Sequence, residues 1–399
     1  MKHLFGLVAV VCMTASCNKE EVLPKTYDSG TYINFGTPFL TVSSVSRASS
    51  ARLLTDFPES ARFGVFGYCL AYTPGTGTSN RVIDYQSGSA LWELKSSRCP
   101  ADVLYNVPVT YTRGVCSYEY VGGGPRKWYT DADTQGNNDA DDYLYSFFAY
   151  YPYGYKGYTV KPADSSTPGA PVITFSMPFD SYVAETVLEA SDTPDAMLSV
   201  LYNRTRLDGN LQFSFSHILS SLSFAVQNYN ENPEQKLKVY SVKLSGTFYK
   251  SILLDFNKRD DFYRYLGDTY AGTYEIYRNP QGLDIYYGAQ TCPVCENTVL
   301  LLPGPKDAPL GPLVRQTSGG KESDIAVTIE YKFYHGEEPS ETKKAVISRP
   351  ATFLPSSGVH YTAQLNFVGD AFVLIFTPDH SDIWGDPNPE GKDDGIIFQ

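Results

Sequence analysis

The stretch that decides the fold class reads Ile325-Ala326-Val327-Thr328-Ile329-Glu330-Tyr331-Lys332-Phe333. Every odd-numbered position in it is apolar or aromatic, while the even positions include Thr, Glu and Lys. Because successive side chains of a strand point to opposite faces, this alternation predicts a strand with one buried face. Residues 211–216, 222–226 and 361–367 repeat the pattern.

Two further runs, 63–72 and 143–151, are apolar on both faces. Such strands should be central in a sheet or covered by another segment on their outer side. Gly, Pro, Asn and Asp punctuate the chain between the runs, which is typical of turns. Helical periodicity is scarce, and residues 181–202 are the best candidate for one or two short helical turns. Many short strands without intervening helices predict an all-β fold of antiparallel β-sandwiches.

With 399 residues the chain is long enough for two domains in tandem. A turn-rich region from Asp192 to Asn203 precedes a fresh set of strands, which places a boundary near residue 207. We therefore expect an N-terminal domain over 28–207 and a C-terminal domain over 208–399.

The composition is acidic, with a formal net charge of −12. Without residues 1–16, which contain Lys2 and no acid, the charge becomes −13. No run rich in Lys or Arg is present, so a phosphate backbone would be repelled and nucleic acid is not an expected partner. The chain contains 32 tyrosines, as many as its lysines and arginines together. This number of tyrosines is typical of a β-protein, in which tyrosine packs on half-buried strand surfaces. The alternative interpretation is a surface that binds sugars or other proteins.

The chain begins with a basic tip and an apolar run, 4–13, that is too short to span a bilayer of about 30 Å. This order is typical of an export signal. Small residues then precede Cys17, which resembles the lipobox of bacterial lipoprotein precursors, although Thr14 replaces the usual Leu. Lys19, Glu20 and Glu21 resemble the signal that sends Bacteroidota lipoproteins to the outer face of the outer membrane. The resemblance implies a signal peptide, 1–16, and a lipidated surface tether, 17–27; the alternative is an ordinary signal peptide.

The cysteines, the histidines and the sequence motifs predict neither an enzyme nor a metal or cofactor site. Cys12 would leave with the signal and Cys17 would be lipidated, so five of the seven cysteines remain, an odd number whose pairing stays open. Cys292 and Cys295 lack the second ligand pair that zinc requires and the following helix of a redox motif. No catalytic motif is present, and His217, alone on its strand, is expected to be a hydrogen-bonded structural residue. The remaining cysteines are Cys69, Cys99, Cys116, Cys292 and Cys295.

Five short motifs, in this order, resemble the fimbrillin-like proteins of Bacteroidales. Members of that family are type V pilus subunits of two transthyretin-like β-sandwich domains with few short helices. In the family, a trypsin-like protease cuts the lipidated precursor after an arginine, the N-terminal strand leaves, and the C-terminal strand of a neighbouring subunit replaces it. The motifs are FGVFGY (63–68), FFAYYPYG (147–154), LQFSFSHILSSLSF (211–224), LPSSGVHYTAQLNF (354–367) and DIWGD (382–386).

The resemblance assigns the removable strand to residues 31–42, with Ile33, Phe35 and Phe39 on one face. Pro38 would break a ladder bond, which suits an edge strand. The following loop is small and polar and contains Arg47 and Arg52 as cleavage candidates, with Arg47 preferred. The alternative is that both are plain surface arginines.

At the other end, Ile396, Ile397 and Phe398 follow an acidic linker over 379–394 and are expected to act as the donor strand. An apolar chain end of this kind is a liability when it is left free. Residues 372–376 are expected instead to fold into their own domain.

The expected function is therefore a subunit of a cell-surface pilus, with other pilus subunits and the outer-membrane lipid as partners. Whether it would be a stalk, anchor or tip subunit stays open. The alternative is a surface adhesin or glycan-binding lipoprotein that recognises host or microbial glycans or proteins. Its stacking platforms would be Trp92, Trp128 and Trp384, with the loop 122–129 as the best site. A surface hydrolase has no residue constellation to support it.

Overall fold

Strands make up most of the described part of the protein. Within it, the only helical turns are the 3₁₀ turns η3 (Ala190–Asp192) and η4 (Arg206–Asp208), so the all-β prediction is confirmed. None of the helices there is long and apolar enough to cross a membrane. The computed structural model describes residues 27–40, 54, 56–71, 103–120, 122–128, 143–161, 171–230, 235–256, 263–288, 292–293, 298–305, 314–317, 320–350, 355–369 and 371–383.

The first sheet has seven strands and is buried on both faces. β2 and β5, which come from the two runs that are apolar on both faces, lie side by side in its interior. The prediction that they are central is confirmed. In spatial order the strands are β1 (Phe39–Leu40), β10 (Ser214–His217), β9 (Met197–Arg204), β5 (Tyr143–Tyr151), β2 (Arg62–Ala71), β3 (Leu104–Thr112) and β4 (Val115–Ser117).

A four-stranded second sheet packs on one face of the first. Tyr158 of the second sheet meets Tyr150 of the first at 5.0 Å between ring centroids. The opposite face of the first sheet is covered by Ile33, Phe57 and Trp128, which lie outside its strands. The second sheet consists of β14 (Tyr263–Tyr265), β13 (Ser251–Asp255), β7 (Val172–Ser176) and β6 (Tyr158–Lys161).

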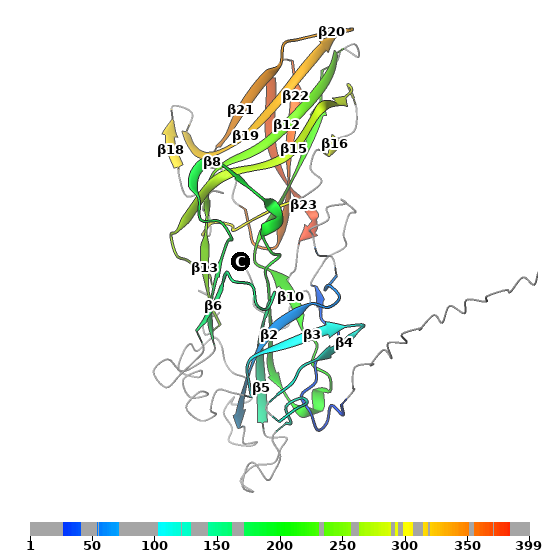
Figure 1. The fold of residues 1–399 in the computed structure, drawn as a ribbon, viewed down its shortest axis with the longest axis vertical. Coiled ribbons are helices and arrows are strands. Elements are labelled where there is room, and N and C mark those ends of the chain that lie inside the picture. Colours follow the sequence, from blue (N-terminus) through cyan, green and yellow to red (C-terminus); the bar gives the residue numbers. More distant parts are fainter. Residues whose placement is uncertain are drawn as a thin grey trace, which may run out of the picture.

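The third and fourth sheets form a second sandwich, which Figure 1 shows above the first sheet. Tyr331 of the third sheet meets Phe372 of the fourth at 4.9 Å. The third sheet has β18 (Val314–Thr317), β19 (Gly320–His335), β12 (Gln235–Tyr249), β15 (Thr269–Ile285) and β8 (Tyr182–Leu188) in spatial order, with β20 (Glu338–Pro339) and β21 (Lys343–Pro350) paired to β19. The fourth has β16 (Cys292–Pro293), β11 (Ser220–Asn228), β22 (Val359–Val368) and β23 (Ala371–Ile383), with β17 (Val299–Leu301) on β11.

The alternating stretch forms the buried face of β19. Ile325, Val327, Ile329 and Tyr331 are all at most 4% exposed. Tyr361, Ala363, Leu365 and Phe367 of β22 are buried in the same way. The predicted strands with one buried face are confirmed.

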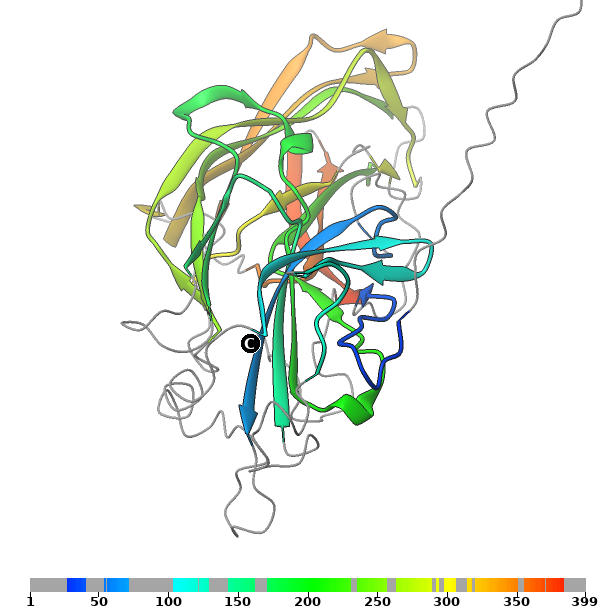
Figure 2. The same cartoon turned by 60° about the horizontal axis from the view of Figure 1, so that its bottom comes forward.

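Strands from both sides of residue 207 share sheets. β7 pairs with β13, β6 pairs with β7 at the edge of the same sheet, and β8 pairs in parallel with β15. Conversely, β10 pairs with β9 of the first sheet. Figure 2 shows the blue and cyan strands of the first sheet crossing below the yellow and orange strands of the third. The boundary near residue 207 stays a prediction.

Residues 181–202 form two strands, β8 and β9, and only the single 3₁₀ turn η3 between them. The expectation of helical turns rested on apolar residues four apart, such as Val183 and Val187. A spacing of four also places two side chains on one face of a strand, and β-branched residues favour strands. Both valines are more than half exposed on β8.

Candidate functional site

The N-terminal segment, residues 27–40, lies along the edge of the first sheet. Its last part, β1, pairs in parallel with β10, and Phe35 forms a parallel bridge to Leu211. On the other side, Tyr32 forms an antiparallel bridge to Lys127. The segment therefore has backbone partners on two sides. We call the residues that hold it, 114–118, 126–128 and 211–215, the segment-binding surface.

Besides the pairing of β1 with β10, five backbone hydrogen bonds connect the segment to this surface. Three of them involve the chain that leads into β10, and two involve the loop 126–128. The bonds run from Gly36 N to Leu211 O (2.8 Å), Leu211 N to Asn34 O (2.8 Å), Phe39 N to Phe213 O (3.1 Å), Ile33 N to Arg126 O (2.8 Å) and Trp128 N to Thr31 O (3.2 Å).

The apolar side chains of the segment complete the core on the outer face of the first sheet. Ile33 is 0% exposed, Phe35 4% and Leu40 8%. The Phe35 ring lies 5.1 Å from the ring of Phe213 and 5.7 Å from that of Phe147. Each such side chain contributes roughly 1.5–3 kcal/mol when it is fully buried. The described residues 31–40 do pack against apolar residues, but only Phe39–Leu40 forms a strand, and removal of the segment stays a prediction.

The prediction that Phe39 shares a face with Ile33 and Phe35 is wrong. Phe39 is 45% exposed, and Leu40 points inward instead. The alternation changes phase at Gly36–Thr37, so that buried positions are odd before it and even after it. An extra residue of this kind reverses the side-chain faces in the same way as a β-bulge. β1 does lie at the edge of its sheet, as Pro38 predicts.

Polar side chains hold the backbone of the segment at positions where no strand partner is present. Burial raises the pKa of Cys116 to about 12 and raises the pKa of Tyr118 as well, so both remain protonated donors at neutral pH. The donors are Tyr118 Oη to Ile33 O (2.7 Å), Cys116 Sγ to Gly36 O (3.2 Å), Thr37 Oγ1 to Gly114 O (2.8 Å) and Gln212 Nε2 to Thr37 O (3.0 Å).

The loop 122–128 forms one wall of the segment-binding surface and does not present a sugar platform. Trp128 is 3% exposed, its Nε1 donates to Ser29 O at 2.9 Å, and its ring meets Tyr145 edge-on at 4.7 Å. The expectation that Trp128 stacks on glycans is therefore wrong. Lys127 lies over the Tyr32 ring at 5.6 Å, which brings the loop against the segment. Trp92 and Trp384 lie outside the described residues.

All of the predicted processing residues also lie outside the described residues and stay predictions. They are Cys17, Lys19, Glu20, Glu21, Arg47, Arg52, Ile396, Ile397 and Phe398. Residues 372–376 are part of β23, which pairs with β22 of the same chain. The expectation that they fold into their own domain is confirmed.

His217 is a buried structural residue, as expected. Its Nδ1 lies 2.6 Å from Asp195 Oδ1, and both side chains are at most 4% exposed. Cys292 belongs to the short strand β16 and not to the start of a helix. Among the residues that the structure describes, no group of three or more His, Cys, Asp or Glu is placed to bind a metal ion.

The described residues form two stacked β-sandwiches, and a separate N-terminal segment completes the first sheet. The family model described as fimbrillin-like matches residues 98–370. Because this is more than half of the chain, the protein belongs to the fimbrillin-like family. It is therefore a fimbrial subunit or adhesion protein of the cell surface, and the family implies a structural role in assembly with other pilus subunits.

One solved structure supports the same fold. A fimbrial protein from Bacteroides vulgatus is 17% identical, with a TM-score of 0.55, over 88% of this chain and 98% of that chain. The tip fimbrial protein Mfa3 from Porphyromonas gingivalis, with a C-terminal truncation, is 9% identical, with a TM-score of 0.30, over 80% of this chain and 94% of that one. Because its TM-score exceeds 0.5, only the first of these two comparisons bears on the fold. No curated protein matches the chain.

Proposed function

We propose that the chain is a pilus subunit that is exported as a lipoprotein through Cys17 and trimmed after Arg47 or Arg52. Lys19, Glu20 and Glu21 would direct it to the outer face of the outer membrane. The observation that carries the proposal is the burial of Ile33, Phe35 and Leu40 in a core whose other buried members all come later in the chain, from Phe57 to Phe215. Both arginines follow these side chains in the sequence. A cut at either site would leave the segment held by noncovalent contacts alone.

Departure of the segment would expose Phe213 and Phe147 and free the backbone groups of 126–128 and 211–213. A strand from a neighbouring subunit can cover the exposed rings and pair with the freed backbone groups, because strand addition supplies apolar side chains together with backbone hydrogen bonds. Ile396, Ile397 and Phe398 have the required character. Each apolar side chain would contribute roughly 1.5–3 kcal/mol to the subunit contact.

Limited trypsin digestion of the full chain tests the proposal. We expect one early cut, a new N-terminus at Ala48 or Leu53, and ladders on unboiled detergent gels. Arg47→Gln and Arg52→Gln identify the cleaved bond, and deletion of residues 395–399 should remove the ladders while leaving the cut. A trimmed protein that loses its segment and remains monomeric would rule out polymerisation by this route.

The reactivity of Cys116 reports whether the segment-binding surface opens. In the intact protein, burial raises the pKa of its thiol to about 12. Little thiolate is therefore present at pH 8, and alkylation by iodoacetamide should be slow. After trimming and loss of the segment, the thiol becomes accessible, its pKa falls toward the ordinary value, and alkylation at Cys116 should accelerate by about tenfold or more. Peptide mapping by mass spectrometry measures this site alone, and an unchanged rate would mean that the surface stays closed.

The alternative function is a surface adhesin or glycan-binding lipoprotein of the same fold. With Trp128 buried, the observation that favours this alternative is a different surface, the outer face of the third sheet. Tyrosines and lysines of β12 and β19 and the chain around the end of β15 lie together there.

A further inference from the structure

The outer face of the third sheet carries a cluster that we call the tyrosine–lysine face. It consists of Lys236, Lys238 and Tyr240 on β12, Lys332 and Tyr334 on β19, Asp284 on β15 and Tyr286 immediately after it. The register sets Lys236 opposite Tyr334, and Lys238 opposite both Lys332 and Asp284. Their neighbours Leu237 and Val239 are fully buried, so the cluster lies on the side away from the core.

The ammonium group of Lys236 lies between two tyrosine rings. Its Nζ is 5.2 Å from the centroid of Tyr334 and 5.9 Å from that of Tyr286. It also forms an ion pair with Asp284 at 2.9 Å, and the hydrogen bond to that carboxylate raises the pKa of Lys236. These contacts hold a charged amine beside exposed aromatic surface, with Tyr286 58% exposed.

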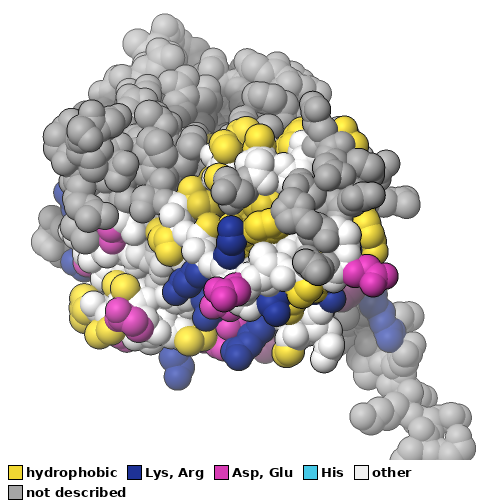
Figure 3. Space-filling model, turned by 90° about the horizontal axis from the view of Figure 1, so that it is seen from above, with side chains coloured by type: hydrophobic (Ala, Val, Ile, Leu, Met, Phe, Trp, Pro, Cys, Tyr) yellow, Lys and Arg dark blue, Asp and Glu magenta, His cyan; other side chains and the backbone are white. Residues whose placement is uncertain are grey.

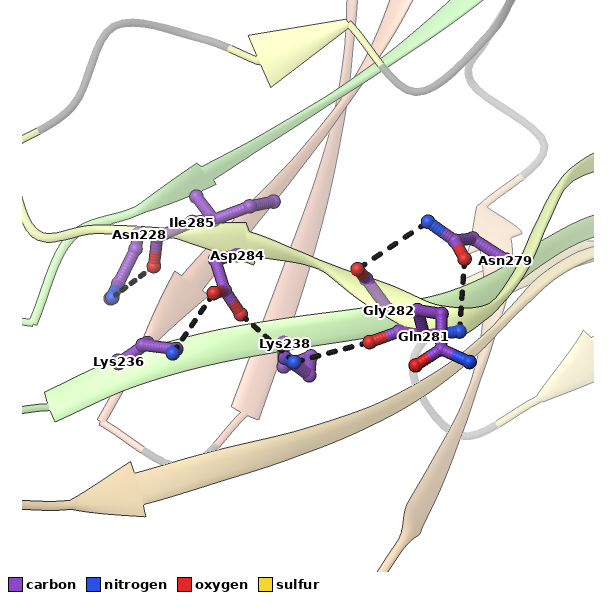
Figure 4. A network of polar contacts seen from close by, with 8 residues as sticks. All are labelled: Asn228, Lys236, Lys238, Asn279, Gln281, Gly282, Asp284 and Ile285. Carbon is purple, nitrogen blue, oxygen red and sulfur yellow. Dashed lines mark hydrogen bonds and ion pairs between the residues drawn. The ribbon is translucent and has the colours of Figure 1, made fainter. Parts of the chain in front are cut away.

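The same carboxylate also positions Lys238, as Figure 4 shows. Lys238 Nζ lies 3.4 Å from Asp284 and donates to Gln281 O at 3.1 Å. Lys332 Nζ lies 5.9 Å from the Tyr240 ring. Asp284 thus forms ion pairs with both Lys236 and Lys238, and Lys332 adds a further positive charge.

This part of the sheet is positive in an acidic chain. Within 236–243, 275–286, 328–334 and 343–347, the outward-facing charged residues are six basic and three acidic, a difference of +3, whereas the whole chain carries −12. Figure 3 shows Lys and Arg side chains gathered at this end of the molecule, with acids among them. A local positive field on an acidic protein favours anionic ligands at that place. The six basic residues are Lys236, Lys238, Lys243, Arg278, Lys332 and Lys344, and the acids are Glu275, Asp284 and Glu330.

We propose that the tyrosine–lysine face binds an acidic polysaccharide. Exposed tyrosine rings offer flat apolar surface for the faces of sugar rings, and the lysines offer partners for carboxylate or sulfate groups. Amines on one strand repeat every second residue, about 7 Å apart, and neighbouring strands are about 4.8 Å apart, which suits a polymer of charged sugars. An acidic peptide cannot add as a strand here, because β12 already has β15 and β19 on its two sides.

The proposal deepens the adhesin alternative and does not depend on polymerisation, since a pilus subunit and a non-polymerising lipoprotein would both present this face. Binding of the full chain is measured by biolayer interferometry at physiological salt. The probes are polygalacturonate for carboxylates, heparin for sulfates, dextran as a neutral polysaccharide and poly-glutamate as an acidic peptide. We expect binding to one or both acidic polysaccharides and none to dextran.

Substitutions in the tyrosine–lysine face test whether the polysaccharide binds there. The double variant Lys236→Gln/Lys238→Gln should weaken binding about tenfold by removing two amine contacts, and Tyr286→Ala should weaken it about threefold by removing a stacking ring. The matched control, Lys156→Gln/Lys161→Gln, removes the same charge from exposed positions at β6 and just before it. It should leave affinity within about twofold, because long-range charge effects are screened at this salt.

Three outcomes would overturn the proposal. These are no binding to either acidic polysaccharide, unchanged binding in the double variant, and binding to poly-glutamate as tight as to the polysaccharides with no effect of Tyr286→Ala. Circular dichroism checks that each variant folds. If the double variant is unfolded, the result for the half-exposed Tyr286→Ala decides. The trypsin and ladder results are independent of all these outcomes.

Discussion

Phe35 and Phe39 are four positions apart in the same segment and have opposite environments. Phe35 is 4% exposed and contacts the rings of Phe213, Phe147 and Tyr118, whereas Phe39 is 45% exposed. We expect Phe35→Ala to lower the free energy of unfolding by about 3–5 kcal/mol, because it leaves a cavity in the core. Phe39→Ala should change it by less than about 1 kcal/mol.

Urea denaturation followed by tryptophan fluorescence measures both values, and the two substitutions remove the same atoms. Equal losses in the two variants would contradict the assignment of inward and outward positions. If only Phe39→Ala lowered the free energy of unfolding, Phe39 would point into the core, and the change of phase at Gly36–Thr37 would be contradicted.

At the level of single residues, sequence reasoning identified Ile33 and Phe35 but missed Leu40. The phase change at Gly36–Thr37 leaves no mark in a period-two pattern, so it could not be predicted. Trp128 was misplaced because it follows a Gly-rich loop, which resembles exposed surface in a sequence. Its burial comes from Tyr145 and Ser29, which are distant in the chain.

The motif FGVFGY of β2 is explained by packing between neighbouring strands. Gly64 lies opposite Tyr150 and Gly67 opposite Phe147 in the pairing with β5. A Cβ at Gly64 would overlap the Tyr150 ring, and one at Gly67 would lie 2.9 Å from Phe147. Each glycine thus makes room for an aromatic ring that folds across the adjacent strand.

We expect Gly64→Ala to lower the free energy of unfolding by about 1–3 kcal/mol, because the added methyl group forces the Tyr150 ring to move. Gly36→Ala is the control: its nearest contacts would be at 3.8 Å, which is ordinary packing, and its effect should stay within about 0.5 kcal/mol. Thermal denaturation measures both. A neutral Gly64→Ala would show that the ring has free space to move into.

The alternation of apolar and polar residues predicts most strand positions, but it does not predict which strands pair with one another. Period two reports that one face is buried, but it does not say which element covers it. The pairing of β8 with β15 and of β7 with β13 joins segments more than seventy residues apart. No local pattern specifies such contacts. The helical turns expected within 181–202 have a different cause, because a spacing of four residues fits one face of a helix and one face of a strand alike.

Across the whole molecule, one hydrophobic cluster runs from the first sheet through the second into the upper sandwich. It includes Phe148 of β5, Ile252 of β13, Leu244 of β12 and Leu365 of β22. Because this cluster is continuous through the described residues of both sandwiches, we expect a single cooperative unfolding transition, with equal calorimetric and van't Hoff enthalpies. Differential scanning calorimetry of the full chain measures this. Two separated transitions, or a fragment 208–399 that folds on its own, would contradict it.

The order of the strands along the chain also determines when the second sheet can form during synthesis. β6 and β7 leave the ribosome well before β13, the strand that joins them to the rest of the sheet. Until β13 emerges, Ile173 and Phe175 lack one of their neighbouring strands. The early half of the chain is therefore kept incomplete while the later half is made. A polypeptide that must be threaded through a membrane before it folds gains from this delay.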